Sequence, residues 1–568
     1  MSTPFSEVPP NAVAAPAAPS RAQQLRWPSR PALQVETMVA LCAAFLLLTG
    51  NRPFWRALLE GRPAGEAASW LFAAAVFGAL AGLYTFCLCL VTTRHTVKPV
   101  LGVALLVTAA ASFYMDRYAI YFDREMLRNV LATNPKEARD LLTWDFALHV
   151  TLFGVLPLLA ICWPRVAPRR LRRAAAVRLL WLCAAVLVAV GSLMPVFADF
   201  ASQMRNHRET RHLITPGNIV ASMASNAWGR GKRPDGPRIT VGADAHLGSA
   251  WAARKRPVLF VLVVGETARS ANFSLNGYSR LTNPLLARQG VISFGDVTAC
   301  GTSTEVSLPC MFSPFGRRQY NEENIRSHES LLHVLKRAGF QVLWRDNQSG
   351  CKGVCDGLPS EQLDSAKVEA LCAEGQCLDE ILLKGMEGVA RDSTGNLFVV
   401  MHQMGSHGPA YFKRYPAVAK HFAPACENPD LRHCSAAEIM NAYDNSLVYT
   451  DYFLSRVVDF LGQAQKRYDT AMIYVSDHGE SLGESGLYLH GVPYPIAPKV
   501  QTRVPLVMWL SPSFRQNFGV NQECLRSHAA ASASHDHLFH SVLGVLDIGT
   551  SVYDRAMDLF APCRVSAA

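Results

Sequence analysis

The stretch Val258-Leu-Phe-Val-Leu-Val-Val264, followed at once by Gly265-Glu266, indicates the fold of the C-terminal half of the chain. A continuous apolar run of this length is typical of a strand that is covered on both faces. Similar runs recur downstream with helical segments between them, which predicts an α/β layered domain with a largely parallel sheet over residues 257–568. The further strands are expected at residues 342–344, 397–401, 471–475 and 504–509.

Polar side chains follow these strands at their carboxyl ends, where ligand sites gather in a parallel sheet. They stand at positions 265–266, 345–348, 402–407 and 476–480. Folding is expected to bring Glu266, Asp477 and His478 together, and their mixed oxygen and nitrogen donors suit zinc. Taken alone, the Asp-His-Gly segment would indicate no more than a structural salt bridge, so the metal prediction depends on its combination with Glu266.

The segment Cys300-Gly-Thr-Ser-Thr-Glu-Val-Ser-Leu-Pro-Cys310 is a candidate nucleophile loop. Hydroxyl residues are common in turns and helix caps, so their presence alone proves little. A disulfide between Cys300 and Cys310 would fix the loop, and a helix starting near Thr304 would direct backbone N–H groups at a phosphate. An alcohol is a poor nucleophile at neutral pH, but a metal ion bound to one threonine of the loop would lower the pKa of its hydroxyl.

Apolar runs crowd into the first 200 residues, and five of them approach the length needed to cross a membrane. Basic segments precede the first run and follow the second and the fourth, and the positive-inside rule puts these segments in the cytoplasm. Five crossings then place everything after residue 200 outside. The expected spans are residues 34–50, 70–93, 97–118, 147–164 and 176–197.

This pattern divides the chain into four parts. Ahead of the domain at 257–568, we expect a disordered cytoplasmic tail (1–33), a transmembrane domain of five helices (34–199) and a periplasmic linker with short surface helices (200–256). In the linker, Trp228 and Trp251 are expected either at the level of lipid headgroups or in ordinary packing. The net charge of +10 lies largely in the membrane flanks, which argues against a nucleic-acid partner.

Ten of the 15 cysteines lie in the polar C-terminal region, mostly as close pairs. An even number at short spacings argues for disulfides, and therefore for an oxidising compartment such as the periplasm. A zinc ribbon is the alternative, but the pairs at 351/355 and 372/377 lack regular zinc-ligand spacing. The cysteines and the basic loops thus predict the same compartment.

Several motifs together resemble one family, the lipid A phosphoethanolamine transferases, which include the mobile colistin-resistance enzymes. The motifs are Val264-Gly-Glu-Thr-Ala-Arg269, Cys300-Gly-Thr-Ser-Thr304, Ser406-His-Gly-Pro-Ala-Tyr411, Asn441-Ala-Tyr-Asp-Asn445 and Ser476-Asp-His-Gly-Glu-Ser-Leu-Gly-Glu484. The resemblance extends from the membrane helices to residues 535–540. It implies a periplasmic sulfatase-like domain of the alkaline phosphatase superfamily behind the transmembrane helices.

The resemblance also implies roles for individual residues at the centre of the site. Glu266, Thr304, Asp477 and His478 would hold one tightly bound zinc ion, with Thr304 as the nucleophile and a second zinc possible during turnover. His407 and His490 would bind the phosphate or that second zinc and protonate the leaving group, a task that suits an imidazole. Without the resemblance, His490 is equally consistent with a histidine that caps a turn.

Further residues are expected to bind substrate by the same resemblance. Lys352 would contact the phosphate, and Gln348, where some relatives have Asn, would make a weaker contact. Asn129, Thr133 and Glu137 would face the lipid headgroup, although Glu137 could instead stabilise the start of a helix. The expected disulfides are Cys300–Cys310, Cys351–Cys355, Cys372–Cys377, Cys426–Cys434 and, as the two cysteines that remain, Cys524–Cys563.

The expected function is a zinc-dependent phosphotransferase of the bacterial inner membrane, acting as a monomer. Phosphatidylethanolamine would give its phosphoethanolamine group to Thr304, and a lipid A phosphate would then take it. The added ammonium group would weaken the binding of cationic peptides such as polymyxin. The alternatives are transfer to core sugars of lipopolysaccharide, transfer of phosphoglycerol, and a membrane sensor that keeps the fold without catalysis; the nucleophile loop lacks the sulfatase signature Cys/Ser-x-Pro-x-Arg.

Overall fold

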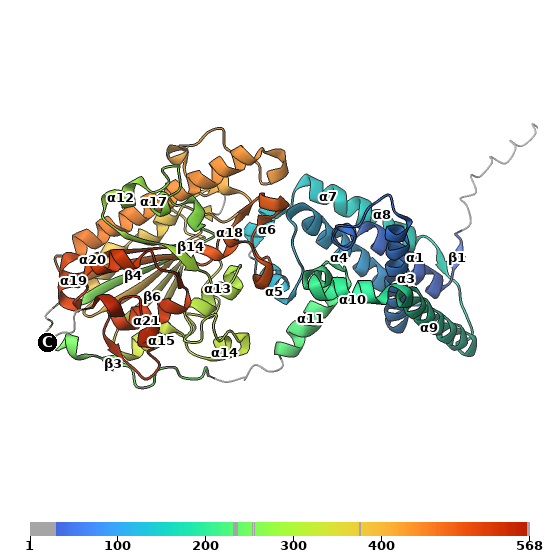
Figure 1. Cartoon of the computed structure of the whole chain (residues 1–568), viewed down its shortest axis with the longest axis horizontal. Coiled ribbons are helices and arrows are strands. Elements are labelled where there is room, and N and C mark those ends of the chain that lie inside the picture. Colours follow the sequence, from blue (N-terminus) through green and yellow to red (C-terminus); the bar gives the residue numbers. More distant parts are fainter. Residues whose placement is uncertain are drawn as a thin grey trace, which may run out of the picture.

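The computed structural model describes residues 30–133, 135–230, 237–252, 254, 256–373 and 376–564. A helical N-terminal unit and a larger α/β unit lie end to end (Figure 1). Most of the expected tail, residues 1–29, lies outside the described part of the chain. Its last residues differ from the expectation of disorder, because β1 (Ala32–Leu33) pairs in parallel with β2 (Arg165–Val166).

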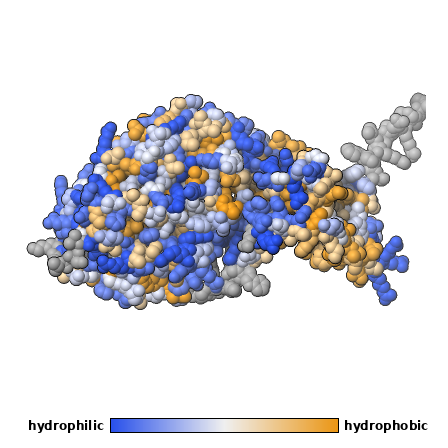
Figure 2. Space-filling model, viewed as in Figure 1, coloured by the Kyte–Doolittle hydropathy of each residue, from blue (hydrophilic) through white to orange (hydrophobic). Residues whose placement is uncertain are grey.

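The helical unit has the dimensions of a membrane domain. Four helical stretches are long and apolar enough to span a bilayer among the described residues, and a fifth span results if α1 and α2, bent by 62°, are counted as one. Hydrophobic surface gathers on this unit (Figure 2). The helices are α1 (Val35–Thr49), α2 (Arg52–Leu59), α3 (Ala67–Val91), α4 (Val97–Tyr118), α7 (Trp144–Val150) continuing through a π-helical turn (Thr151–Val155) into α8 (Leu156–Cys162), and α9 (Leu171–Leu193) continuing into α10 (Phe197–Asn206).

One end of this unit carries the basic residues that the positive-inside rule assigns to the cytoplasm. Glu36, at the start of α1, is bonded by Arg169 and Arg178, each at 3.0 Å. Arg178 also donates to the carbonyl of Thr92, just after α3. The start of α1, the end of α3 and the start of α9 therefore meet at one end of the unit, as five alternating crossings require.

The C-terminal unit is built on an eight-stranded sheet of order β15-β5-β14-β11-β4-β10-β6-β7. The central strands β11, β4, β10 and β6 are parallel, which confirms the predicted fold class. Residues 503–510, expected within a largely parallel sheet, instead form a strand that runs antiparallel to both of its neighbours. The strands are β4 (Val258–Gly265), β5 (Ile292–Thr298), β6 (Gln341–Asp346), β7 (Ser360–Gln362), β10 (Leu397–His402), β11 (Asp469–Ser476), β14 (Arg503–Leu510) and β15 (Ala533–Ser534).

Both faces of the sheet are buried, as the continuous apolar runs indicate. Along β4, Phe260 and Leu262 enter one hydrophobic core, whereas Val261 and Val263 enter the other. The first core is covered by α13 (Thr304–Met311), α15 (Leu331–Arg337), α19 (Pro512–Phe518), α20 (Gln522–His528) and α21 (Asp536–Val545), and the second by α12 (Pro284–Arg288), α16 (Met386–Asp392) and α17 (Ala436–Ala464). Burial on both faces holds the strand ends in fixed positions at one edge.

The segment between the two units differs from the expected linker. Residues 237–252 belong structurally to the α/β unit, because β3 (His246–Leu247) pairs with β16 (Ile548–Gly549). Trp251 packs against Phe340 and Phe518, and its indole N–H donates to the carbonyl of Leu546. Of the two alternatives for Trp251, ordinary packing is therefore correct. The side chain of Trp228 lies outside the residues that the structure describes. Paired segments of two residues are too short to leave a strand pattern in the sequence.

Short helices connect the units and place one against the other. They are α5 (Arg124–Ala132), α6 (Pro135–Leu141), α11 (Gly217–Arg230) and, on the α/β side, α14 (Glu322–Ser327). Ion pairs that cross the boundary include Arg117–Asp430, Arg128–Glu322 and Asp140–Lys413. Five disulfides lie in the α/β unit, between the same partners that the sequence analysis names: Cys300–Cys310, Cys351–Cys355, Cys372–Cys377, Cys426–Cys434 and Cys524–Cys563.

Candidate metal centre and active site

Three potential metal ligands meet at the carboxyl ends of β4 and β11. Glu266 follows β4 directly, and Asp477 and His478 follow β11, its parallel neighbour. One donor atom of each lies within 4.8 Å of the other two, and all three side chains are fully buried. The register that pairs Ser476 with Gly265 explains this convergence, since it sets the two strand ends level.

Thr304 lies in contact with this cluster, at the first residue of α13. Its Oγ1 donates to Oε2 of Glu266 at 3.0 Å and lies 3.3 Å from Nε2 of His478. The Cys300–Cys310 disulfide joins the start of the loop to the last turn of the helix. The backbone N–H groups of the first turn of α13 lie beside the same hydroxyl, an arrangement that favours a bound phosphate.

The chemistry of the cluster fits a divalent cation. Two buried carboxylates this close together repel each other, and Oδ2 of Asp477 makes no hydrogen bond within the described part of the chain. His478 offers Nε2 to the same space, at 3.3 Å from Glu266 and 3.4 Å from Asp477. Burial lowers the pKa of His478 well below its usual value, so its ring is neutral and can act as a ligand. Two oxygens, one imidazole nitrogen and the Thr304 oxygen match the donors that zinc prefers.

Two further histidines stand above the cluster. The ring centroid of His490 lies 4.4 Å from that of His478 and 5.6 Å from that of His407. His490 follows the short strand β13 (Tyr488–Leu489), and its Nδ1 lies 3.2 Å from Oε2 of Glu480. Burial, and then the neighbouring His490, lower the pKa of His407 well below its usual value. His490 is thus held against a buried carboxylate.

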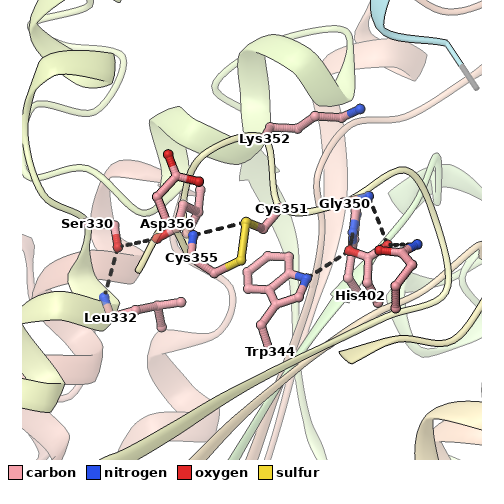
Figure 3. The surroundings of a disulfide bond; sticks show 12 residues. Ser330, Leu332, Trp344, Gly350, Cys351, Lys352, Cys355, Asp356 and His402 are labelled. Carbon is pink, nitrogen blue, oxygen red and sulfur yellow. Dashed lines mark hydrogen bonds and ion pairs between the residues drawn. A yellow bond between two sulfur atoms is a disulfide. The ribbon is translucent and has the colours of Figure 1, made fainter. Parts of the chain in front are cut away.

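Gln348 and Lys352 occupy different surroundings. Gln348 donates through Nε2 to Oε2 of Glu266 at 2.5 Å, so it contacts the cluster through one of its carboxylates. Lys352 stands on the loop that the Cys351–Cys355 disulfide closes, and it extends away from Trp344 (Figure 3). Its Nζ donates to Oγ of Ser349 at 2.7 Å, and its side chain lines the cavity described below.

The expected headgroup residues of the membrane unit lie on α5 and just beyond it. Thr133 caps the end of α5 by donating from Oγ1 to the carbonyl of Asn129 at 2.8 Å. Glu137 belongs to α6, but its side chain lies outside what the structure describes. The start of α5 approaches the site, because Met126 lies against Gly491, next to His490.

The structure adds two buried residues to which the sequence analysis gave no role. Glu480 belongs to a quoted motif but carries no signal that separates it from a surface carboxylate; it is fully buried against His490. His535 accepts from the backbone N–H of Cys300 at 3.1 Å and donates to the carbonyl of Ser476 at 2.9 Å. It thereby ties the nucleophile loop to the end of β11, and no local pattern predicts that contact.

A large cavity of about 1520 Å³ opens between the two units. It is lined by residues of α5, of the segment that follows α9 and of α14, together with Lys352 and with Glu305, which follows Thr304 in the sequence. The metal-cluster residues are not in its wall. The cavity therefore leads from the membrane unit towards the cluster without including it.

Comparison with known proteins agrees with this arrangement. Residues 259–548 match the Sulfatase family and residues 80–228 match the family described as Phosphoethanolamine transferase EptA/EptB. Phosphoethanolamine transferase EptA of Escherichia coli K12 is 36% identical over 541 residues, which cover 94% of this chain and 98% of that protein. Phosphatidylethanolamine transferase Mcr-1 of Escherichia coli is 37% identical over 486 residues, covering 83% of this chain and 89% of that protein.

A solved structure is similar over both units. It is the integral membrane lipooligosaccharide phosphoethanolamine transferase A (EptA) from Neisseria meningitidis, with a TM-score of 0.90 and 37% sequence identity. The match covers 94% of this chain and all of that one. On the strength of these full-length matches, the chain belongs to the phosphoethanolamine transferases, integral membrane proteins with a sulfatase-like domain on the periplasmic side.

Proposed function

We propose that the chain moves phosphoethanolamine from phosphatidylethanolamine to a phosphate of lipid A, with Thr304 as the nucleophile. The single observation that carries this proposal is the position of the Thr304 hydroxyl, 3.0 Å from Glu266 and 3.3 Å from His478. The donor follows from the name of the relative Mcr-1, a phosphatidylethanolamine transferase. The acceptor class follows from the Neisseria relative, which acts on lipooligosaccharide.

In the proposed site, Glu266, Asp477, His478 and Thr304 would hold a zinc ion. When bound, zinc would lower the pKa of the threonine hydroxyl and offset negative charge on the phosphate. The N–H groups at the start of α13 and the ammonium of Lys352 would hold the phosphate oxygens. Gln348 would keep Glu266 oriented, since it bonds one oxygen of that carboxylate.

The reaction divides into two exchanges at one phosphorus atom. Thr304 Oγ1 gives its proton to the His407 and His490 pair and forms a bond to phosphorus while the bond from phosphorus to the diacylglycerol oxygen breaks, and the departing oxygen takes that proton from the pair. A lipid A phosphate oxygen then attacks the same phosphorus, and Thr304 leaves. Glu480 would orient His490 through its contact with Nδ1, which leaves Nε2 of His490 available for the proton.

The expected product carries one more ammonium group than unmodified lipid A. The outer surface of a cell that makes it would be less negative, and cationic peptides such as polymyxin would bind it less well. Asn129, Thr133 and Glu137 remain proposed contacts to the donor headgroup. Their support is the position of α5 and α6 between the membrane helices and the site.

The proposal is tested by expressing the chain in a Gram-negative host and measuring the mass of its lipid A. We expect phosphoethanolamine to be added by the wild type and lost in Thr304→Ala at equal protein level. Ser313→Ala is the matched control, because Ser313 is another buried hydroxyl that lies beyond the far end of α13. Modification found only on core sugars would reassign the acceptor, and modification that persists in Thr304→Ala would exclude this nucleophile.

A further inference from the structure

The cavity between the units has features that the donor lipid alone does not explain. Pockets for drug-sized ligands measure about 300–1000 Å³, whereas this one measures about 1520 Å³. A phosphoethanolamine headgroup is smaller than a drug-sized ligand, so it would leave most of the space unfilled. The wall reaches Lys352 and Glu305, the residue after Thr304, and also α5 and the end of α10 in the membrane unit.

Arg128, in the wall of the cavity, has two buried donor atoms without a hydrogen-bond acceptor among the described residues. Arg128 pairs with Glu322 through Nη1, and its side chain is 15% exposed. Its Nε and Nη2 are buried without a hydrogen-bond acceptor among the residues that the structure describes. Unmet donors of a buried guanidinium are costly, and an oxyanion with several acceptor oxygens would satisfy them.

Two more arginines line the membrane side of the same cavity. Arg205 lies in the last turn of α10 and Arg211 follows shortly after, and both are exposed. Neither has a carboxylate within ion-pair distance in the described ranges of the chain. By contrast, the carboxylates of Glu322 and Glu305 on the opposite wall are already bonded by Arg326. On the side that faces the membrane unit, the wall carries four arginines (Arg124, Arg128, Arg205 and Arg211) and three carboxylates (Asp123, Glu125 and Glu209), so one positive charge is in excess there.

We infer that this cavity binds the phosphate-bearing headgroup of the acceptor lipid, with Arg128 donating to the phosphate and Arg205 and Arg211 attracting it. The inference rests on the proposed function. A phosphate monoester carries more negative charge than the zwitterionic donor, and planar guanidinium groups suit its oxygens. The acceptor phosphate would thus wait between the membrane unit and Thr304 until the donor headgroup has been transferred to the threonine.

The two exchanges can be measured separately on the full-length protein in detergent. Release of diacylglycerol from phosphatidylethanolamine without acceptor reports the first exchange, and phosphoethanolamine on added lipid A reports the second. We expect Arg205→Glu combined with Arg211→Glu to lower the ratio of transfer to release about tenfold or more, with a higher KM for lipid A, because two charges are reversed. Arg128→Lys keeps a charge beside Glu322 but loses Nε and the planar fork, so the ratio should fall severalfold.

The control is Arg139→Glu, the same charge reversal at an exposed position of the membrane unit outside the cavity wall. The ratio of transfer to release in this variant should equal that of the wild type. An equal fall of both exchanges in the arginine variants would assign the cavity to the donor and overturn the inference. An unchanged ratio in those variants would also overturn it. If the wild type releases no diacylglycerol, the proposed function itself fails, and this outcome is distinct from the other two.

Discussion

Replacing Asp477 by Asn should stabilise the metal-free protein while removing its response to metal. Donor atoms of Glu266 and Asp477 lie within 4.8 Å of each other, and two unit charges at that distance repel by about 3 kcal/mol at an effective dielectric constant of about 20. Asn is nearly isosteric, and its Oδ1 keeps the bonds that Oδ1 of Asp477 accepts from the N–H groups of Thr267 and His478. The free energy of unfolding of the metal-free form should therefore rise by about 3 kcal/mol or less.

The stabilisation of the metal-free protein by Asp477→Asn should increase with pH. Burial raises the pKa of Asp477, so the folded metal-free protein holds this proton more tightly than the unfolded chain does. The stability of the metal-free wild type therefore falls as the pH rises above the ordinary pKa of an aspartate. The advantage of Asp477→Asn should be larger at pH 8 than at pH 5.

Thermal unfolding of the full-length protein, with and without a chelator, measures the stability of the metal-free form and the stabilisation that bound metal adds. The chelator should lower the Tm of the wild type and leave that of Asp477→Asn unchanged. Asp451→Asn is the matched control, because Asp451 is a buried aspartate that caps α12 away from the cluster, and it should keep the chelator response. A chelator response in Asp477→Asn equal to that of the wild type would refute the reasoning, as would a metal-free variant less stable than the metal-free wild type.

Three other substitutions test separate parts of the account. Gly405 has a φ of +54°, and a Cβ there would lie 2.7 Å from the carbonyl oxygen of Glu266. Gly405→Ala should therefore cost about 1–3 kcal/mol of stability. It should also lower the affinity for the metal, which chelator competition measures. Replacing Cys524 and Cys563 by Ala opens a loop with a sequence separation of 39 and should lower the free energy of unfolding by about 4 kcal/mol in urea titrations. Burial lowers the pKa of His540 to about 4. The folded state therefore loses stability as the pH falls from about 6.5 towards that value. His540→Gln should flatten the curve of Tm against pH between these two values.

The apolar runs of the sequence predict the centre of the sheet well, because burial on both faces makes them continuous. Their ends also lead to Glu266, Asp477 and His478, since neighbouring parallel strands end level with each other. β5 leaves a weaker signal, because Gly295 and Asp296 interrupt its apolar pattern. The antiparallel direction of residues 503–510 is set by the long-range register with β11, which no local periodicity encodes.

The residues that support the site are harder to predict than those at its centre. Glu480 and His535 act through contacts with His490 and with the backbone of Cys300, which the fold alone brings within reach. The bond from Gln348 to Glu266 is likewise a long-range contact, and the predicted contact of Gln348 with substrate stays a prediction. The interdomain position of Arg128 depends on how the membrane unit docks, and no spacing in the sequence reports that geometry.

The most direct test of the central claim is the mass of the Thr304 peptide after the full-length protein has reacted with phosphatidylethanolamine in the absence of lipid A. We expect one phosphoethanolamine group on Thr304, removed when lipid A is added and absent after chelation of the metal. A modified peptide elsewhere in the chain, or an unmodified Thr304 while diacylglycerol is being released, would contradict it.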